Sequence, residues 1–125
     1  MPYSNSGVTH YTVNGTGRVS KWTVCKYADG VIEIYARTSS ADSVMTSTYG
    51  NGFYTSVAQA IPSGIFTSID YASVHRCGGS TSNGLISVSL KAMTTSEISW
   101  YVYNTQTGTL NIAFAIHIVG RWDGN

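Results

Sequence analysis

The sequence predicts an all-β protein, a jelly-roll-like antiparallel β-sandwich of about nine strands. Short segments with alternating apolar and polar residues follow one another, separated by glycine, asparagine, aspartate and serine. No segment fits the 3.6-residue apolar period of an amphipathic helix. In the last segment Leu110, Ile112, Phe114, Ile116 and Ile118 occupy every second position. Because successive side chains of a strand point to opposite faces, this run predicts a strand with one buried face.

The first part of the chain contains a predicted hairpin. We expect strands over Val8 to Val13, Val19 to Tyr27 and Val31 to Arg37. Asp29 and Gly30 lie between the second and third of these strands, and an Asp-Gly pair between two alternating runs favours a type I′ turn. That turn requires positive φ angles at both central residues. We therefore expect the second and third strands to pair around Asp29 and Gly30.

The remaining segments continue the pattern of short strands. The further strands are expected over Val44 to Thr48, Phe53 to Ile61, Phe66 to Cys77, Leu85 to Met93, Ser96 to Asn104 and the run that begins at Leu110. Within the segment that starts at Ser96, the apolar residues at 98, 100 and 102 alternate with Tyr101 and Tyr103. The two tyrosines are therefore predicted to lie on the face opposite the core.

Length and charge limit the kinds of protein that this chain can be. Its 125 residues suit one domain, in which residues 1–16 form a lead-in with the first strand and residues 17–125 form the sandwich. The seven Lys and Arg residues are dispersed, and the net charge of +1 gives no phosphate-binding stripe, so no nucleic-acid partner is expected. No run approaches the ~20 apolar residues of a membrane span. The start of the chain also lacks the features of a signal peptide.

Residues that could carry catalysis or bind a metal are few. Glu33, Asp70 and Glu97 have no assigned role, but nothing in the sequence selects a facing pair of the kind that glycosidases use. His75 and Cys77 are two residues apart on one predicted strand, yet no third or fourth ligand is apparent. We therefore predict no catalytic residue, no metal site and no cofactor. His117 is expected to be partly buried and hydrogen-bonded, and Cys25 and Cys77 to be free thiols.

Tyrosine is the residue type that points to binding. A rigid ring with a hydroxyl offers contact area at a low entropic cost, and sugar- and protein-binding surfaces use it. The alternative is that these rings pack between the sheets or between subunits. The candidate ligand-binding residues are Tyr49, Asn51, Tyr54, Tyr71, Tyr101 and Tyr103. The loops Tyr49 to Tyr54 and Gly78 to Gly84 are the expected contact regions, because loops carry recognition more often than strands do.

Two segments resemble the C-terminal head domains of phage and prophage tail fibre and baseplate proteins, which are receptor-binding proteins. The first segment runs from Lys21 to Tyr35, and its matching residues are Lys26-Tyr27, Asp29-Gly30, Glu33 and Tyr35. The second comprises Trp100 to Thr105 and the ending Gly120-Arg121-Trp122. Lys26-Tyr27 matches as a pair of a lysine and an aromatic residue, but the family pattern has Trp where this chain has Tyr27, and Arg where it has Cys25.

The resemblance implies a trimeric adhesion module. Such a head domain would be made in the host cytoplasm without a signal peptide, lie at the tail tip or baseplate of a virion, and bind a host-surface polysaccharide without cleaving it. Its partners would be two further copies of the chain and other tail or baseplate proteins. The residues expected to determine the fold or the trimer are Trp22, Asp29, Gly30, Trp100 and Trp122. Lys26 and Glu33 are expected to meet near the hairpin turn.

Three alternatives remain open from the sequence. The chain can be a free-standing bacterial lectin-like protein that binds carbohydrate for its own host. It can also be a purely structural component of a virion tail. A small glycan-cleaving enzyme would have to use Glu33, Asp70 or Glu97.

Overall fold

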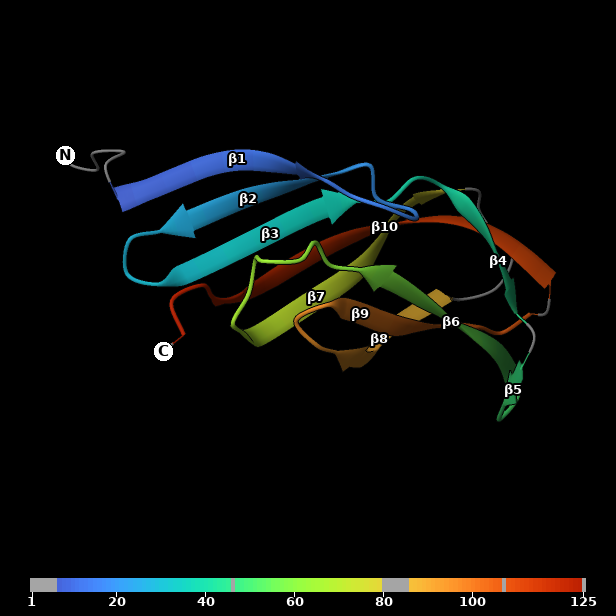
Figure 1. Ribbon diagram of the computed structural model, residues 1–125. Coiled ribbons are helices and arrows are strands. Elements are labelled where there is room, and N and C mark those ends of the chain that lie inside the picture. Colours follow the sequence, from blue (N-terminus) through green and yellow to red (C-terminus); the bar gives the residue numbers. More distant parts are fainter. Residues whose placement is uncertain (1–6, 46, 80–85, 107, 125) are drawn as a thin grey trace.

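Ten antiparallel strands form two packed sheets in the computed structural model, which describes residues 7–45, 47–79, 86–106 and 108–124 (Figure 1). This arrangement confirms the predicted all-β sandwich. It has one strand more than expected, because the segment predicted as Val44 to Thr48 belongs to two strands, β4 (Ala41–Met45) and β5 (Ser47–Tyr49). These two strands lie in different sheets, so the chain crosses from one layer to the other within this segment.

The larger sheet is built around the C-terminal strand. It contains β1 (Val8–Asn14), β2 (Lys21–Tyr27), β3 (Val31–Arg37), β4, β7 (Ser68–Gly79) and β10 (Gly108–Arg121). Its first strands follow the order β1-β2-β3-β10, and β7 pairs with the opposite edge of β10. Because β10 is long, β3 pairs with its second half while β4 pairs with its first half. The strongest alternating run in the sequence therefore lies at the centre of the larger sheet.

The smaller sheet has the order β5-β6-β9-β8. It contains β5, β6 (Gly52–Ala60), β8 (Ile86–Met93) and β9 (Glu97–Asn104). Late strands lie between earlier ones in both layers, since β10 lies between β3 and β7 while β9 lies between β6 and β8. This interleaving of early and late strands is jelly-roll-like.

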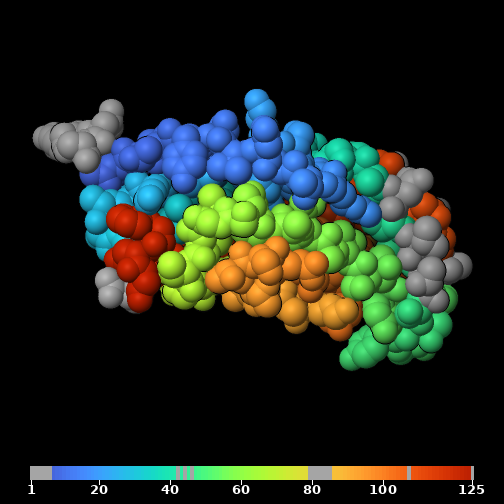
Figure 2. Space-filling view, viewed as in Figure 1, coloured from blue at the N-terminus to red at the C-terminus, as the bar shows by residue number. Residues whose placement is uncertain are grey.

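The core lies between the two sheets. Trp22 of β2, Trp100 of β9 and Phe114 of β10 are fully buried there, and the rings of Trp100 and Phe114 meet edge to face with centroids 5.2 Å apart. Residues 61–67 cross from β6 to β7 and close one side of the sandwich, as the yellow-green segment in Figure 2 shows. Ile61, Ile65 and Phe66 of this crossing belong to the core. Trp22 and Trp100, expected to determine the fold or the trimer, thus lie inside a single chain.

The hairpin between β2 and β3 forms as predicted, but its turn is not type I′. Gly30 has a φ angle of 99°, whereas no described residue other than glycine has a positive φ angle, so Asp29 lacks the positive φ that type I′ requires. The Gly30 amide donates a hydrogen bond to the Tyr27 carbonyl at 3.2 Å. The loop therefore has three residues, with the geometry of a type I turn followed by a left-handed glycine.

The chain ending is fastened to this hairpin. The Trp122 indole N–H donates to the Tyr27 carbonyl at 2.7 Å, and the Trp122 amide donates to the Gly30 carbonyl at 2.9 Å. Arg121 donates to the Asp29 carbonyl at 2.7 Å and pairs with Asp123 at 3.0 Å. The two segments that carry the family resemblance are therefore in direct contact.

The expected contact between Lys26 and Glu33 is not formed. Lys26 lies opposite Ile32 in the ladder, on the core side, and its ammonium lies 4.3 Å from the centroid of the Trp122 ring. Glu33 lies opposite Cys25, on the other face of the sheet. The two charges are separated because their positions in the hairpin register differ by one residue.

Candidate functional site

A cleft lined by tyrosines lies on the outer face of the smaller sheet. Its volume is about 580 Å³, and we call it the tyrosine cleft. It is lined by Tyr49, Gly50, Asn51, Tyr54, Ser89, Tyr101 and Tyr103. These residues come from β5, the turn after it, β6, β8 and β9, so every strand of the smaller sheet contributes.

Strand register brings the rings together. Tyr54 of β6 pairs directly with Tyr103 of β9, and Tyr101 of β9 lies opposite Ser89 of β8. Trp100 and Val102, which alternate with Tyr101 and Tyr103 along β9, are fully buried on the core side. The alternation of β9 therefore sends its indole into the core and its two phenols to the outer face, as predicted for Tyr101 and Tyr103.

The tyrosine rings form a connected array of edge-to-face contacts. The ring of Tyr49 lies 6.4 Å from that of Tyr54 and 6.5 Å from that of Tyr103, both nearly perpendicular. Tyr54 contacts Tyr101 at 5.7 Å. This geometry is the one that aromatic quadrupoles prefer, and it holds the rings in fixed relative positions. Tyr49 remains 72% exposed at the tip of the array, so its face is available to a ligand.

A glycine allows this arrangement next to the turn. A side chain at Gly52 would overlap the hydroxyl and ring of Tyr103, so the absence of a Cβ atom makes room for that ring. Gly50, at the tip of the turn, has a φ angle of 59°. The sequence Gly50-Asn51-Gly52 therefore both reverses the chain and leaves room for the Tyr103 ring in the tyrosine cleft.

The lining of the tyrosine cleft is aromatic and polar but uncharged. It offers four phenol hydroxyls, the Asn51 amide and the Ser89 hydroxyl. Lys91 lies at the margin, with its ammonium 5.5 Å from the centroid of the Tyr101 ring. Flat apolar faces beside neutral donors and acceptors suit a polyhydroxylated ligand better than a strongly charged one.

Five of the six predicted binding residues meet in this cleft, namely Tyr49, Asn51, Tyr54, Tyr101 and Tyr103. Tyr71 does not, because β7 belongs to the larger sheet, where its ring contacts His117 at 6.3 Å. Sequence reasoning missed Ser89, whereas Gly50 belongs to the expected contact loop Tyr49 to Tyr54. Ser89 lies on an alternating strand whose polar side was predictable, but only the pairing of β8 with β9 places it beside Tyr101. Of the expected contact loop Gly78 to Gly84, residues 80–84 lie outside the described residues.

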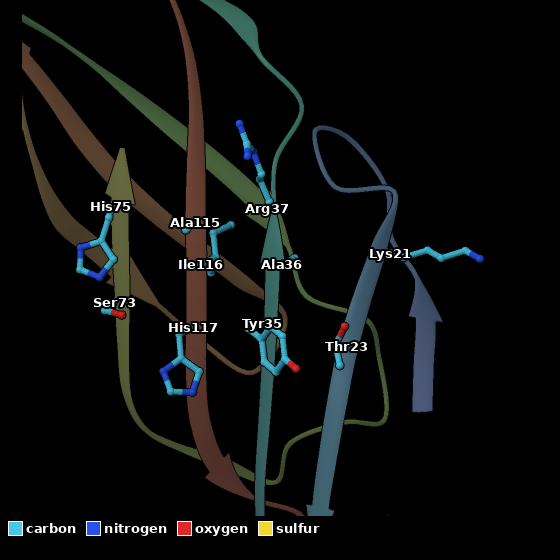
Figure 3. Close-up of a pocket in the computed structure, with 10 residues that line it drawn as sticks. All are labelled: Lys21, Thr23, Tyr35, Ala36, Arg37, Ser73, His75, Ala115, Ile116 and His117. Carbon is cyan, nitrogen blue, oxygen red and sulfur yellow. The ribbon is translucent and has the colours of Figure 1, made fainter. Parts of the chain in front are cut away.

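A second hollow, of about 530 Å³, lies on the outer face of the larger sheet (Figure 3). We call it the basic groove, and its lining residues are Lys21, Thr23, Tyr35, Ala36, Arg37, Ser73, His75, Ala115, Ile116 and His117. His117 is partly buried, as expected, and its Nε2 lies 3.5 Å from Oε2 of Glu33. Two imidazoles, a guanidinium and an ammonium therefore share this groove.

The candidate catalytic carboxylates are not assembled into a site. Glu33 accepts a hydrogen bond from the Tyr27 hydroxyl at 3.3 Å and contacts His117, whereas Glu97 begins β9 in the other sheet. Asp70 is on β7, and neither hollow is lined by any of the three. Neither hollow therefore contains two of these carboxylates as the facing pair that glycoside hydrolysis uses.

The thiols and histidines also form no metal cluster among the described residues. The pairing of β7 with β10 shifts between Arg76 and Gly78, and this irregularity at Cys77 interrupts the alternation expected to align it with His75. Both cysteines are free, and Cys77 is exposed. Burial, with a smaller contribution from the Glu33 charge, raises the pKa of the Cys25 thiol, whose sulfur lies 3.4 Å from Nδ1 of His10. A raised pKa argues against a reactive thiolate at Cys25.

Comparisons with known proteins found no matching family model, no matching curated protein and no matching solved structure. Among the residues that the structure describes, no helix is long and apolar enough to cross a membrane. Fold and site together define the chain as an antiparallel β-sandwich protein with an aromatic surface cleft.

Proposed function

We propose that this chain is a non-enzymatic adhesion module that binds a host-surface glycan in the tyrosine cleft. The observation that carries the proposal is the connected array of Tyr49, Tyr54, Tyr101 and Tyr103 beside Asn51. The C–H faces of a sugar ring stack on aromatic rings, while its hydroxyls exchange hydrogen bonds with amide and hydroxyl groups. The cleft volume of about 580 Å³ lies within the range of roughly 300–1,000 Å³ found for small-molecule sites. It therefore suits a short stretch of a polysaccharide.

The composition of the cleft supports binding without cleavage. Its lining contains no carboxylate or imidazole, and Ser89 has no base beside it in that lining. Most glycoside hydrolases use a carboxylic acid and a second carboxylate across the scissile bond. A ligand in the tyrosine cleft would be held by stacking and neutral hydrogen bonds, with no group placed to protonate a leaving oxygen.

The proposed setting is the head domain of a phage tail fibre or baseplate protein at the tip of a virion, with other tail or baseplate proteins as partners. This part of the proposal rests on the resemblance of the Lys21 to Tyr35 hairpin and the Gly120-Arg121-Trp122 ending. The contact of Trp122 with Tyr27 and Gly30 supports an interpretation of the shared residues as determinants of the fold.

The proposed assembly is a homotrimer. Strand β8 lies at an edge of the smaller sheet and leaves Leu90 41% and Met93 37% exposed, which is apolar area that a neighbouring subunit would cover. Light scattering on a sizing column should give three times the 13.4 kDa chain mass. A monomer would contradict the trimer and favour the lectin-like alternative, because the tyrosine cleft is complete within one chain.

Binding can be tested with a matched pair of tyrosine variants. We expect wild-type protein to bind a defined set of neutral glycans on an array, and Tyr49→Ala to weaken that binding roughly tenfold, the effect of losing one central aromatic contact. Tyr49 is 72% exposed, so its removal should leave the fold intact. Tyr71→Ala is the control, since Tyr71 is 55% exposed on the other sheet.

Two results would contradict the proposal. The first is an array on which the wild-type protein binds no glycan. The second is an equal loss of binding in Tyr49→Ala and Tyr71→Ala. Release of reducing ends from a bound polysaccharide would instead assign an enzyme.

A further inference from the structure

We propose that the basic groove is a second ligand site, which binds the phosphate or carboxylate group of an anionic sugar. This site lies on the outer face of the larger sheet and shares no lining residue with the tyrosine cleft. Its anion-binding groups are Arg37, His75 and His117, arranged around the methyl group of Ala115. The inference does not depend on the proposed function, because it rests on different residues.

Strand register creates a small floor between two cationic or polar side chains. Ala115 of β10 pairs with Arg37 of β3 on one side and with His75 of β7 on the other. Neighbouring strands lie about 4.8 Å apart, so the backbones of Arg37 and His75 are separated by about 10 Å across Ala115. The methyl side chain leaves this space open above the sheet. An oxyanion placed there would be within reach of both longer side chains.

A second row on the same face supplies a third donor and an aromatic wall. His117 follows Ala115 on the outer side of β10 and pairs with Tyr35 and Ser73. In Figure 3 the imidazoles of His75 and His117 lie on one side of Ala115, and the Arg37 side chain extends away from them on the other side. The rings of Tyr35 and His117 meet edge to face at 6.5 Å, and Tyr35 is 46% exposed. A sugar ring can stack on Tyr35 while its anionic group lies over Ala115.

The position of the guanidinium depends on a neighbouring glycine. A Cβ atom added to Gly78 would lie 2.6 Å from Nη2 of Arg37, so the guanidinium extends across β10 into the space that this glycine leaves open. The guanidinium therefore lies near Ala113, which pairs with Gly78 and precedes Ala115 by two residues on the same face of β10. Planar guanidinium groups bind phosphates and carboxylates with two parallel hydrogen bonds.

Within the described part of the chain, His117 of the basic groove has a carboxylate partner, Glu33, but the charges of Arg37 and Lys21 are not neutralised. Neither Arg37 nor Lys21 forms an ion pair there, since the ion pairs join His117 to Glu33 and Arg121 to Asp123. Glu33 also accepts the Tyr27 hydroxyl, and it lies outside the groove lining. Lys21 points away from the centre in Figure 3 and adds charge without contacting the proposed anion. An anionic ligand would supply the missing countercharge.

The experiment is a chemical-shift titration of the whole ¹⁵N-labelled chain at fixed pH and ionic strength. The probes are glucose 6-phosphate, glucuronate and glucose. We expect an anionic sugar to shift the amides of Arg37, His75 and Ala115 in a saturable manner, while glucose leaves them unchanged. A response to glucose 6-phosphate alone assigns a phosphate site, and a response to glucuronate alone assigns a carboxylate site. Response to both assigns a general anion site.

Charge-matched variants separate this site from nonspecific attraction. Arg37→Gln should weaken binding of the anionic sugar by about tenfold, because it removes a charge-assisted hydrogen bond. Lys91→Gln removes the same charge from the opposite sheet and should leave the affinity unchanged. Equal losses in the two variants, or the absence of localised shifts with both anionic sugars, would overturn the proposal. The ligand-free spectrum of each variant is compared with that of the wild-type protein, so a folding defect is recognised directly.

Discussion

The outer faces of the two sheets differ in chemistry, although the same alternation of side chains produces both. On the smaller sheet this face gathers Tyr49, Tyr54, Tyr101 and Tyr103 around neutral amides and hydroxyls. On the larger sheet it gathers imidazoles and Arg37 around a methyl floor. The comparison shows that each surface site of this sandwich is built from residues of several strands. Each strand contributes one to three lining residues, and the sheet order decides which of them meet.

The two faces also differ in how their side chains are held. The tyrosines contact one another in a continuous array, so each ring restricts its neighbours. In the basic groove the aromatic contacts involve His117 with Tyr35 and Tyr71, whereas the charged side chains extend over small residues. We therefore expect the tyrosine cleft to be preorganised for its ligand. The basic groove would gain order when an anion binds, at a cost in side-chain entropy.

The largest expected effect contrasts the two sides of β9. Trp100→Ala should lower the free energy of unfolding by about 3–5 kcal/mol, because it leaves a large cavity beside Phe114 in a fully packed core. Tyr101→Ala, one residue further along, should cost about 1 kcal/mol, since Tyr101 is 36% exposed. Denaturant unfolding followed by fluorescence measures both. Equal losses would mean that packing on the tyrosine face contributes as much to the free energy of unfolding as packing in the core.

A smaller effect concerns thiol chemistry on the larger sheet. Cys77 is exposed, whereas Cys25 is buried and its thiol pKa is raised by that burial. A raised pKa lowers the thiolate fraction at neutral pH, so Cys25 should react with a maleimide at least about tenfold more slowly than Cys77. Mass spectrometry of partially labelled protein measures the two rates. Faster labelling of Cys25 would show that this part of the outer face opens readily to solvent.

Local patterning in the sequence predicted most of the strands, and it predicted the direction of side chains within each strand. The alternation in β9 placed Trp100 inside and Tyr101 outside without knowledge of the partner strands. The Asp29-Gly30 pair located a hairpin correctly. Its turn type was wrong because loop length depends on where the ladder ends, and the loop includes one residue more than the pair.

The assembly of sites was less predictable because it depends on long-range pairing. Nothing local indicates that Tyr49 and Tyr101, far apart in the chain, lie on one surface, or that Tyr71 lies on the other sheet. The basic groove was missed for the same reason. His75, Arg37 and Ala115 lie on three separate strands, and only their common register brings them together. The irregularity at Cys77 likewise has no signal in the alternation of the sequence.

The most direct test of the central claim is the location of a bound neutral glycan on the protein. The glycan chosen is the strongest binder from the array, titrated into ¹⁵N-labelled protein. We predict saturable shifts at the amides of Tyr49, Asn51, Tyr54 and Tyr101, with the amides of Arg37 and His75 unchanged. Shifts confined to the larger sheet, or saturation of binding without any shift in the tyrosine cleft, would contradict the account.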